Sequence, residues 1–357
     1  MRQQLPDFPW DSLAPYAEKA RTYPAGIIDL SQGTPVDPTP EIIQSTLSDS
    51  ANSPRYPVTA GTKDLQDAIR KWAIGHLGAT GNFDVLPVIG SKELVAWLPT
   101  LLQSKDVLYP EVSYPTYLVG ALLAQANPIP VSIHAENWPR GDLAWINSPG
   151  NPNGRVHSEL ELRAALAWAR ENKANLICDE CYIDFGDSIT PTSLLRYTDG
   201  ENSNVLVVHS LSKRSSMAGY RGAFLIGDPQ LIAQIREVRK HAGMMVPLPI
   251  QNSMVAALSD ETHVNEQRAR YNARRATLIP ALKAAGFQIE DSVAGLYIWC
   301  TRSEDGWKSV DWLAQIGILA TPGSFYGPLG ASHIRVAMTA TDAQISEAAS
   351  RIKSASN

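Results

Sequence analysis

Short apolar runs alternate with amphipathic stretches through the middle of this chain. Because the runs are apolar almost without interruption, each predicts a strand that is buried on both faces. They are VLPVIG (85–90), DVLYP (106–110), PIPVSI (128–133), LAWINS (143–148), NLICDE (175–180), NVLVVHS (204–210) and GAFLIG (222–227). Helical patterns lie between several of them, at 93–103, 115–126 and 158–173, and the last starts with the Ser158 and Glu161 spacing of a capping box. This alternation predicts a three-layer α/β fold, with a mostly parallel sheet covered by helices on both sides.

The pattern changes after residue 250. A long polar helix is expected over 266–286, apolar strands at 295–300 and 333–339, and an amphipathic helix at the C-terminus. We therefore expect a large domain over 41–255 and a smaller α+β domain over 256–357. Residues 1–40 are rich in proline and turn residues, and are predicted to pack on the small domain.

Composition narrows the class of protein. The 357 residues are 44% hydrophobic and carry a formal net charge of −5, without a block of Lys and Arg for binding nucleic acid or an anionic membrane. The opening MRQQLPDFPWDSL lacks a secretory pattern, and no apolar run reaches transmembrane length. Because the chain has only three cysteines, a reducing compartment is favoured, and the cytoplasm is the expected location.

Cys178 and Cys181 form a C-x-x-C pair, which can indicate a redox or zinc site. No second cysteine pair and no nearby His at ligand spacing accompany it. We interpret both cysteines as small core residues and expect no metal site.

Polar residues gather where the predicted strands end, which is where parallel α/β sheets bind ligands. Gly90, Ser91 and Lys92 lie between a strand and a helix, a position that favours an anion such as phosphate. Asp179 ends a buried strand, where an unpaired carboxylate is costly, so it should have a cationic or protonated partner.

Lys213 follows another apolar strand in VVHSLSKRSSMAGYRGAFLIG, residues 207–227. Ser210 and Ser212 precede it and Arg221 follows, so hydroxyls and a guanidinium could hold a dianionic group beside the amine. An enclosed lysine amine can form a Schiff base with a carbonyl.

These motifs resemble, in order and spacing, the fold-type I, class I/II aminotransferases that depend on pyridoxal 5'-phosphate. The motifs are N-P-x-G at Asn151, D-x-x-Y at Asp179 and Tyr182, S-x-S-K ending at Lys213, and G-x-R-G around Arg221. The resemblance runs over nearly the whole chain, from SQGTP at 31–35 to HIRVAMT at 333–339.

The resemblance implies a role for each matching residue. Lys213 would carry the cofactor, Asp179 would keep its ring nitrogen protonated, and Tyr182 would bond the ring's phenolic oxygen together with Asn151. The phosphate would be held by Ser91, Lys92 (through its backbone N–H), Ser210, Ser212 and Arg221. Tyr114 would stack on the ring, although the same segment also permits Tyr117.

Other implied residues face the substrates and a second subunit. Arg335 would grip the substrate's α-carboxylate, and Gly33 would approach the same group together with Asn151. Tyr56 resembles a tyrosine that reaches the phosphate from the neighbouring subunit, which implies a homodimer with shared active sites. The expected partners are therefore amino acids, 2-oxo acids and a second copy of the chain.

Two N-terminal stretches, LPDFPWDSL (5–13) and GTPVDPTP (33–40), resemble actinobacterial N-succinyldiaminopimelate aminotransferases. This implies transfer of an amino group from glutamate to N-succinyl-2-amino-6-oxopimelate in lysine and diaminopimelate biosynthesis. Aspartate, aromatic and histidinol-phosphate aminotransferases, and carbon–sulfur β-lyases of the same fold, remain open alternatives. The succinyl and distal carboxylates of that acceptor would also need partners, and the positively charged Arg55, Arg140 and Arg302 are candidates.

Overall fold

A seven-stranded sheet forms the centre of the computed structural model, which describes residues 5–356. Its strands lie in the order β2-β8-β7-β6-β5-β3-β4. Their bounds are β2 (Asp84–Val88), β3 (Asp106–Pro110), β4 (Asn127–Val131), β5 (Leu143–Asn147), β6 (Asn175–Asp179), β7 (Val205–Ser210) and β8 (Ala223–Gly227). β8 alone runs opposite to the other six strands, so the predicted mostly parallel sheet is confirmed.

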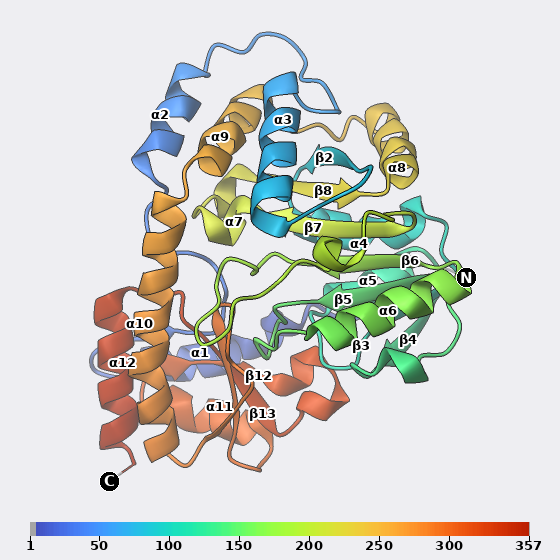
Figure 1. The fold of residues 1–357 in the computed structure, drawn as a ribbon. Helices are drawn as coiled ribbons and strands as arrows, with labels where there is room; N and C mark the ends of the chain where they lie inside the picture. Colours follow the sequence, from blue (N-terminus) through green and yellow to red (C-terminus); the bar gives the residue numbers. More distant parts are fainter. Residues whose placement is uncertain (1–4, 357) are drawn as a thin grey trace.

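Helices cover both faces of this sheet, because its strands send alternate side chains into two separate cores. Ile146 of β5 packs in the core beneath α3 (Lys63–Trp72), α6 (Glu159–Asn172) and α9 (Leu248–Ser259). Its neighbour Trp145 packs in the core beneath α4 (Ser91–Leu101), α5 (Thr116–Leu123) and α8 (Pro229–His241). Figure 1 shows α6 in front of the sheet and α4 and α5 behind it. The three-layer α/β prediction is thus confirmed.

The predicted capping box is present at the start of α6, but the predicted burial of β4 is not observed. Ser158 caps α6 and exchanges hydrogen bonds with Glu161 in the predicted capping box. In β4, however, only Val131 is buried, so the prediction of a fully buried strand is wrong there. β4 lies at the edge of the sheet and contains Pro128 and Pro130, which cannot donate backbone hydrogen bonds.

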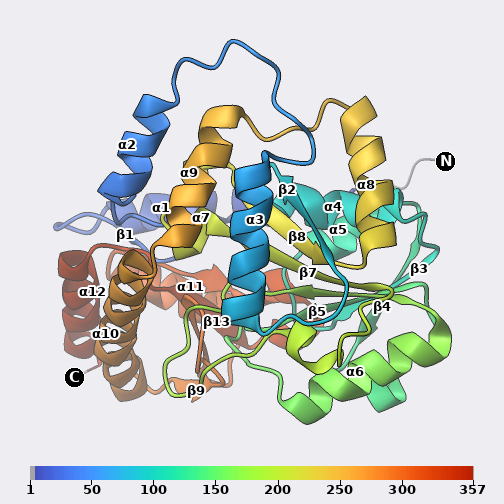
Figure 2. The ribbon, with the colours of Figure 1, turned by 45° about the horizontal axis from the view of Figure 1, so that its top comes forward.

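A second, antiparallel sheet carries the C-terminal part of the chain. Its order is β12 (Thr321–Pro322), β13 (His333–Ala337), β10 (Tyr297–Thr301) and β9 (Gln288–Glu290). The helices of this part are α10 (Thr262–Ala284), α11 (Gly306–Gln315) and α12 (Asp342–Ser354), and Figure 2 shows α10 and α12 side by side. None of the helices within residues 5–356 is long and apolar enough to cross a membrane.

Part of the N-terminal segment, within its described residues 5–40, lies against this second sheet. β1 (Ile28–Asp29) pairs with β11 (Ile318–Leu319), and α1 (Ala14–Arg21) contacts α11. Leu13, Ile28 and Leu30 belong to the same core as β10 and β13. The domain boundaries at 41 and 256 stay a prediction: α2 (Glu41–Asp49) contacts α9, and α9 itself continues past residue 256.

Short helical elements complete the chain and connect the longer ones. They are α7 (Leu211–Arg214), the π-helix η2 (Ala73–Leu77), and the 3₁₀ turns η1 (Pro9–Leu13), η3 (Ala135–Asn137), η4 (Leu194–Tyr197), η5 (Ala218–Tyr220), η6 (Gly323–Tyr326) and η7 (Pro328–Gly330).

Candidate active site

A cavity of about 360 Å³ lies where β5, β6 and β7 end. Asp179 is the last residue of β6 and Ser210 the last of β7, so the strand ends carry polar groups into one space. All predicted site residues except Tyr56 line the cavity: Gly33, Ser91, Lys92, Tyr114, Asn151, Asp179, Tyr182, Ser210, Ser212, Lys213, Arg221 and Arg335.

Lys213 projects into this cavity from α7, the single helical turn that follows β7. Its Nζ donates a hydrogen bond to the backbone oxygen of Gly33. Burial lowers the pKa of the Lys213 amine, because the charged form loses its hydration. A larger fraction of the amine is therefore neutral, and the neutral form is the nucleophile and proton acceptor.

Asp179 is buried, and its hydrogen-bond partners within the described chain are neutral. Oδ2 accepts from the Tyr117 hydroxyl at 2.9 Å, and Oδ1 accepts from the Cys181 N–H at 3.1 Å. Burial raises the pKa of the Asp179 carboxyl. A cationic group that entered the cavity beside Asp179 would supply the partner expected from the sequence.

Tyr114 and Tyr117 take different positions, although they are three residues apart. Tyr117 in α5 is fully buried, packs against Trp145 with ring centroids 5.0 Å apart, and bonds Asp179. Tyr114 lines the cavity, and burial raises the pKa of its hydroxyl to about 12. Tyr114 is therefore the ring available for stacking on a ligand.

An anion cup forms beside the start of α4, around Ser91. The Ser210 hydroxyl bonds the Ser212 hydroxyl at 3.0 Å, and Arg221 reaches the same wall of the cavity. Gly90 has φ +108°, and a Cβ there would collide with the Arg221 guanidinium. Glycine thus lets a guanidinium approach the positive end of a helix, which concentrates positive potential for an anion.

Arg335 also lines the cavity, from β13, and is only 2% exposed. Its guanidinium donates to Asn151 Oδ1 at 3.0 Å and to the backbone oxygen of Ser31. Aromatic rings surround it: the ring centres of Tyr297, Tyr326 and Trp10 lie 4.0, 5.0 and 5.9 Å from its carbon. The charge is thus held rigidly in a largely apolar setting, where it can bind a carboxylate strongly.

Tyr182 faces Tyr297, with the two hydroxyl oxygens 3.2 Å apart. Burial raises the pKa of the Tyr182 hydroxyl well above its usual value, so this group remains a proton donor at neutral pH.

Several residues of the cavity wall were missed from the sequence. Asn147 at the end of β5 followed the same strand-end pattern as Asp179 and could have been found by it. The others are Phe8, Trp10, Gln32 and Thr34 of the N-terminal segment, Val95 of α4, Ala218 of η5 and Tyr297 of β10. Cys181 is a correction: it is half-buried and lines the cavity, so only Cys178 is the small core residue that was predicted.

Tyr56 and the proposed distal arginines do not line the cavity of this chain. Tyr56 is 93% exposed, in the loop between α2 and α3 that extends at the top of Figure 1. Arg302 pairs with Glu304 and stacks on Trp312, while Arg55 and Arg140 are exposed. The cations that line the cavity are Lys92, Lys213, Arg221 and Arg335.

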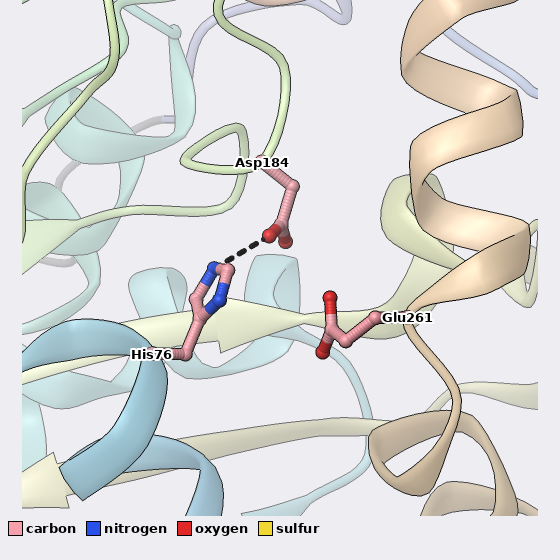
Figure 3. Close-up of side chains that lie close together, drawn as sticks. All are labelled: His76, Asp184 and Glu261. Carbon is pink, nitrogen blue, oxygen red and sulfur yellow. Dashed lines mark ion pairs between the residues drawn. The ribbon is translucent and has the colours of Figure 1, made fainter.

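A second polar cluster, outside the cavity lining, consists of His76 from η2, Asp184 and Glu261 (Figure 3). Their possible ligand atoms lie within 4.8 Å of one another. The buried guanidinium of Arg214, next to Lys213, pairs with Asp184 at 3.2 Å and also with Glu261. His76 Nε2 lies 2.7 Å from the other Asp184 oxygen. Because the Arg214 guanidinium already pairs with both carboxylates and His76 contacts Asp184, we interpret the cluster as a hydrogen-bonded ion-pair network rather than a metal centre.

The family model for aminotransferase class I and II matches residues 25–352. This chain belongs to that family. A probable aminotransferase of Mycobacterium tuberculosis is 48% identical, over 98% of this chain and 85% of its own length. The Streptomyces rimosus protein named 4-dedimethylamino-4-oxo-anhydrotetracycline transaminase OxyQ is 46% identical, over 98% and 99% of the two chains.

The aminotransferase also resembles solved structures over its full fold. A probable N-succinyldiaminopimelate aminotransferase from Thermus thermophilus has a TM-score of 0.90 and 26% identity, and covers 98% of this chain and 100% of its own. The predicted fold-type I architecture is therefore confirmed.

The family depends on pyridoxal 5'-phosphate, which confirms the predicted cofactor. The cavity fits this group on three counts. A lysine amine with a lowered pKa can bond its aldehyde, the buried Asp179 lacks a cationic hydrogen-bond partner among the described residues, and the cup at Ser91 and Arg221 suits its phosphate.

Proposed function

We propose that this aminotransferase transfers the amino group of glutamate to N-succinyl-2-amino-6-oxopimelate, in lysine and diaminopimelate biosynthesis. The products are 2-oxoglutarate and N-succinyl-LL-2,6-diaminopimelate. Amino transfer follows from the family, whereas the acceptor is supported by the N-terminal resemblance and by the name of the Thermus structure. The observation that carries the proposal is the meeting of Lys213, Asp179 and Arg335 in one cavity.

When bound, the cofactor supplies an aldehyde that accepts an amino group and a ring that withdraws electrons from the substrate's α-carbon. The chain's residues would hold it at five points. Lys213 would bond the aldehyde carbon, Asp179 would pair with the ring nitrogen, and Tyr114 would stack on the ring. The hydroxyls and Arg221 of the anion cup would bind the phosphate, while Tyr182 and Asn151 would bond the phenolic oxygen.

Arg335 and Lys213 would have separate roles toward the substrate. Arg335 would bind the α-carboxylate through two parallel hydrogen bonds, which fixes the α-carbon beside the Lys213 amine. Burial lowers the pKa of that amine and so favours its neutral form, which can take the proton from the α-carbon and return it on the other side of the reaction. The same residues serve glutamate and the acceptor, because both present an α-carboxylate.

A homodimer with shared active sites is part of this proposal. Tyr56, which the resemblance assigns to a neighbouring subunit's phosphate, is exposed, and so are the nearby apolar side chains of Val58 and Ile42, at 61% and 50%. Exposed apolar groups of this kind favour burial against another chain. A second copy would cover them and bring Tyr56 to the neighbouring cavity.

A polycyclic ketone is the second candidate acceptor. The relative that is 46% identical is named for such a substrate. In its favour, Phe8, Trp10, Tyr114 and Tyr297 give the cavity wall aromatic faces on which flat rings could stack.

The cofactor assignment is tested by the absorbance of the purified protein and by borohydride reduction, followed by peptide mapping. The label should lie on Lys213, and Lys213→Ala should lose it. Lys63→Ala, an exposed lysine paired with Asp67, should keep it. A colourless protein, or a label on another lysine, would contradict the assignment.

The acceptor is tested by pairing glutamate with a panel of 2-oxo acids, the succinylated acceptor and a polycyclic ketone. Formation of 2-oxoglutarate that depends on the acceptor indicates amino transfer, while release of ammonia and pyruvate from a sulfur amino acid indicates a β-lyase. Inactivity toward the succinylated acceptor would reject that substrate alone.

A further inference from the structure

Lys213 lies on a helical turn that is too short to be stable by itself. α7 has only four residues, whereas isolated helices shorter than about 12–15 residues are marginal in water. The first residue of the turn is tied to the neighbouring chain, because the Leu211 N–H donates to the backbone oxygen of Gly222 at 3.1 Å. The position of the Lys213 amine therefore also depends on what holds the other end of α7.

Arg214 holds that end from outside the cavity. Lys213 lines the cavity, whereas Arg214, the next residue, is absent from its wall within residues 5–356 and is only 2% exposed. The Arg214 guanidinium donates to the backbone oxygen of Ala257 in α9 at 2.8 Å. It also lies over the ring of Trp72 in α3, 5.6 Å from the ring centre. One buried side chain thus connects the Lys213 turn to two helices.

Two ion pairs of Arg214, with Asp184 and Glu261, form what we call the Arg214 brace. Asp184 lies in the segment that follows β6, five residues after Asp179 and two residues after Tyr182. The pair between Arg214 and Asp184, at 3.2 Å, therefore joins the segment of Asp179 and Tyr182 to the turn of the lysine.

The brace is buried on one side and open to solvent on the other. The side chains of Arg214 and Asp184 are 3% and 6% exposed, whereas that of Glu261 is 46% exposed. His76 lies 2.7 Å from the second Asp184 oxygen (Figure 3). Separating a buried pair leaves an uncompensated charge, so the pair with Asp184 resists displacement, while water screens the pair with Glu261.

We infer that Arg214 is a positioning residue for Lys213. Through Asp184 it fixes the lysine turn relative to Asp179 and Tyr182, although its own side chain lies outside the cavity wall. This inference rests on the proposed function, which assigns the movement of the substrate's proton to the Lys213 amine.

A displaced lysine should slow proton transfer more than it weakens substrate binding. A misplacement of about 1 Å at a reacting group can cost about 10²-fold in rate. Arg335, which would bind the α-carboxylate, belongs to β13 of the second sheet and is not part of the brace. Loss of the brace should therefore lower the rate at saturating substrate and leave the half-saturating concentration nearly unchanged.

The test compares Arg214→Lys with the wild-type holoenzyme by rapid-mixing absorbance with glutamate alone. An ammonium cannot reproduce the fixed fork of a guanidinium that bonds the Ala257 oxygen and two carboxylates. The limiting rate should fall about 10- to 10²-fold, while the glutamate concentration at half-maximal rate should stay within about threefold of wild type.

Arg351→Lys is the matched control. Arg351 is 5% exposed, pairs with Glu347 at 2.8 Å and donates to the backbone oxygen of Gly26 at 2.7 Å, but it does not line the cavity. This variant also removes a buried guanidinium, and its limiting rate should stay within about twofold of wild type.

Variants of the two carboxylates rank the halves of the brace. Asp184→Asn should lower the limiting rate more than Glu261→Gln, because only Asp184 is buried and belongs to the segment of Asp179. The double variant Arg214→Lys/Asp184→Asn should lose less than the product of the two single losses, because both substitutions break the same pair.

Amide hydrogen exchange in the cofactor-free protein measures the brace without any reaction. The Ser215 N–H donates to the Leu211 backbone oxygen at 3.0 Å and closes α7. In Arg214→Lys the amides of residues 211–216 should exchange about tenfold faster than in wild type, while those of α6 should not change. Arg351→Lys should leave the exchange of residues 211–216 unchanged.

A limiting rate in Arg214→Lys within about twofold of wild type would overturn the positioning role. An equal loss in Arg351→Lys would overturn it as well, because that result indicates general destabilisation. If Arg214→Lys does not fold, the carboxylate variants decide, and equal rates in Asp184→Asn and Glu261→Gln would reject the brace. If the wild type transfers no amino group, the proposed function fails, and the exchange of residues 211–216 still judges the brace separately.

Discussion

Replacing Arg335 by Lys should weaken both halves of the amino-transfer reaction by the same factor. The guanidinium already donates to Asn151 Oδ1 and to the Ser31 backbone oxygen from a position that is 2% exposed. An ammonium cannot keep both bonds and also bind a carboxylate with two parallel ones. One buried acceptor would lose its donor, and the substrate would lose one charge-assisted hydrogen bond.

The two losses act on different quantities. An unsatisfied buried acceptor costs about 1–3 kcal/mol of folded-state stability in the free and the substrate-bound enzyme alike, so it cancels out of kcat/KM. The lost hydrogen bond to a charged group contributes about 1.5–3 kcal/mol to substrate binding, and its loss lowers kcat/KM roughly 10- to 10²-fold. Rapid-mixing absorbance of each half-reaction, with glutamate and then with the acceptor, measures the two factors separately.

A matched control is Arg302→Lys. Arg302 also stacks on aromatic rings, those of Phe287 and Trp312, but it lies outside the cavity and should leave kcat/KM within about twofold of wild type. A fall of less than tenfold for Arg335→Lys, or a fall confined to one substrate, would refute the assignment of Arg335 to the α-carboxylate.

Three further predictions concern the hydrogen bond to Asp179, the pair of His76 and Asp184, and the second subunit. Tyr117→Phe keeps the packing on Trp145 but removes the hydrogen bond to Asp179. The pKa of Asp179 should therefore rise, and the dissociation constant of the cofactor should increase about tenfold. An unchanged affinity for the cofactor would contradict this prediction. The hydrogen bond to Asp184 raises the pKa of His76 above 6.5, so its stabilisation should be complete below pH 6.5 and disappear as the pH rises through the folded-state value. Urea unfolding of His76→Gln should lack this pH dependence, and parallel profiles of variant and wild type would argue against it. If a dimer shares its active sites, mixing Tyr56→Ala subunits with Lys213→Ala subunits should restore activity at roughly a quarter of the active sites. No recovery of activity would mean that each chain acts alone.

Much of the site could be predicted from the sequence, because polar residues directly follow the apolar runs that form the strands. An apolar run that ends in Asp179, or in Ser210 and Lys213, predicts both a buried strand and a polar group at its C-terminal edge. The order of these residues along the chain also matched a family, so the cofactor and fold followed from sequence. Periodicity is a property of neighbouring residues, and it needs no knowledge of distant contacts.

The choice between Tyr114 and Tyr117 required the tertiary structure, because both belong to one short segment. Only the packing of α5 against Trp145 shows which side chain is buried under Asp179 and which lines the cavity. The wrong interpretation of Cys181 has the same origin. Its burial depends on a cavity formed by residues that are remote in sequence.

The amino-acid sequence by itself determined the alternating strands and helices, the strand-end residues and the family, since these depend on local composition and order. The tertiary structure decided the reversed β8, the exposed edge strand β4 and the meeting of Arg335 with Asn151 and Ser31. It also placed the Lys92 ammonium 5.1 Å from the ring of Phe8, a residue of the distant N-terminal segment. Contacts between residues so far apart depend on how whole sheets and helices pack, and no local period records that packing.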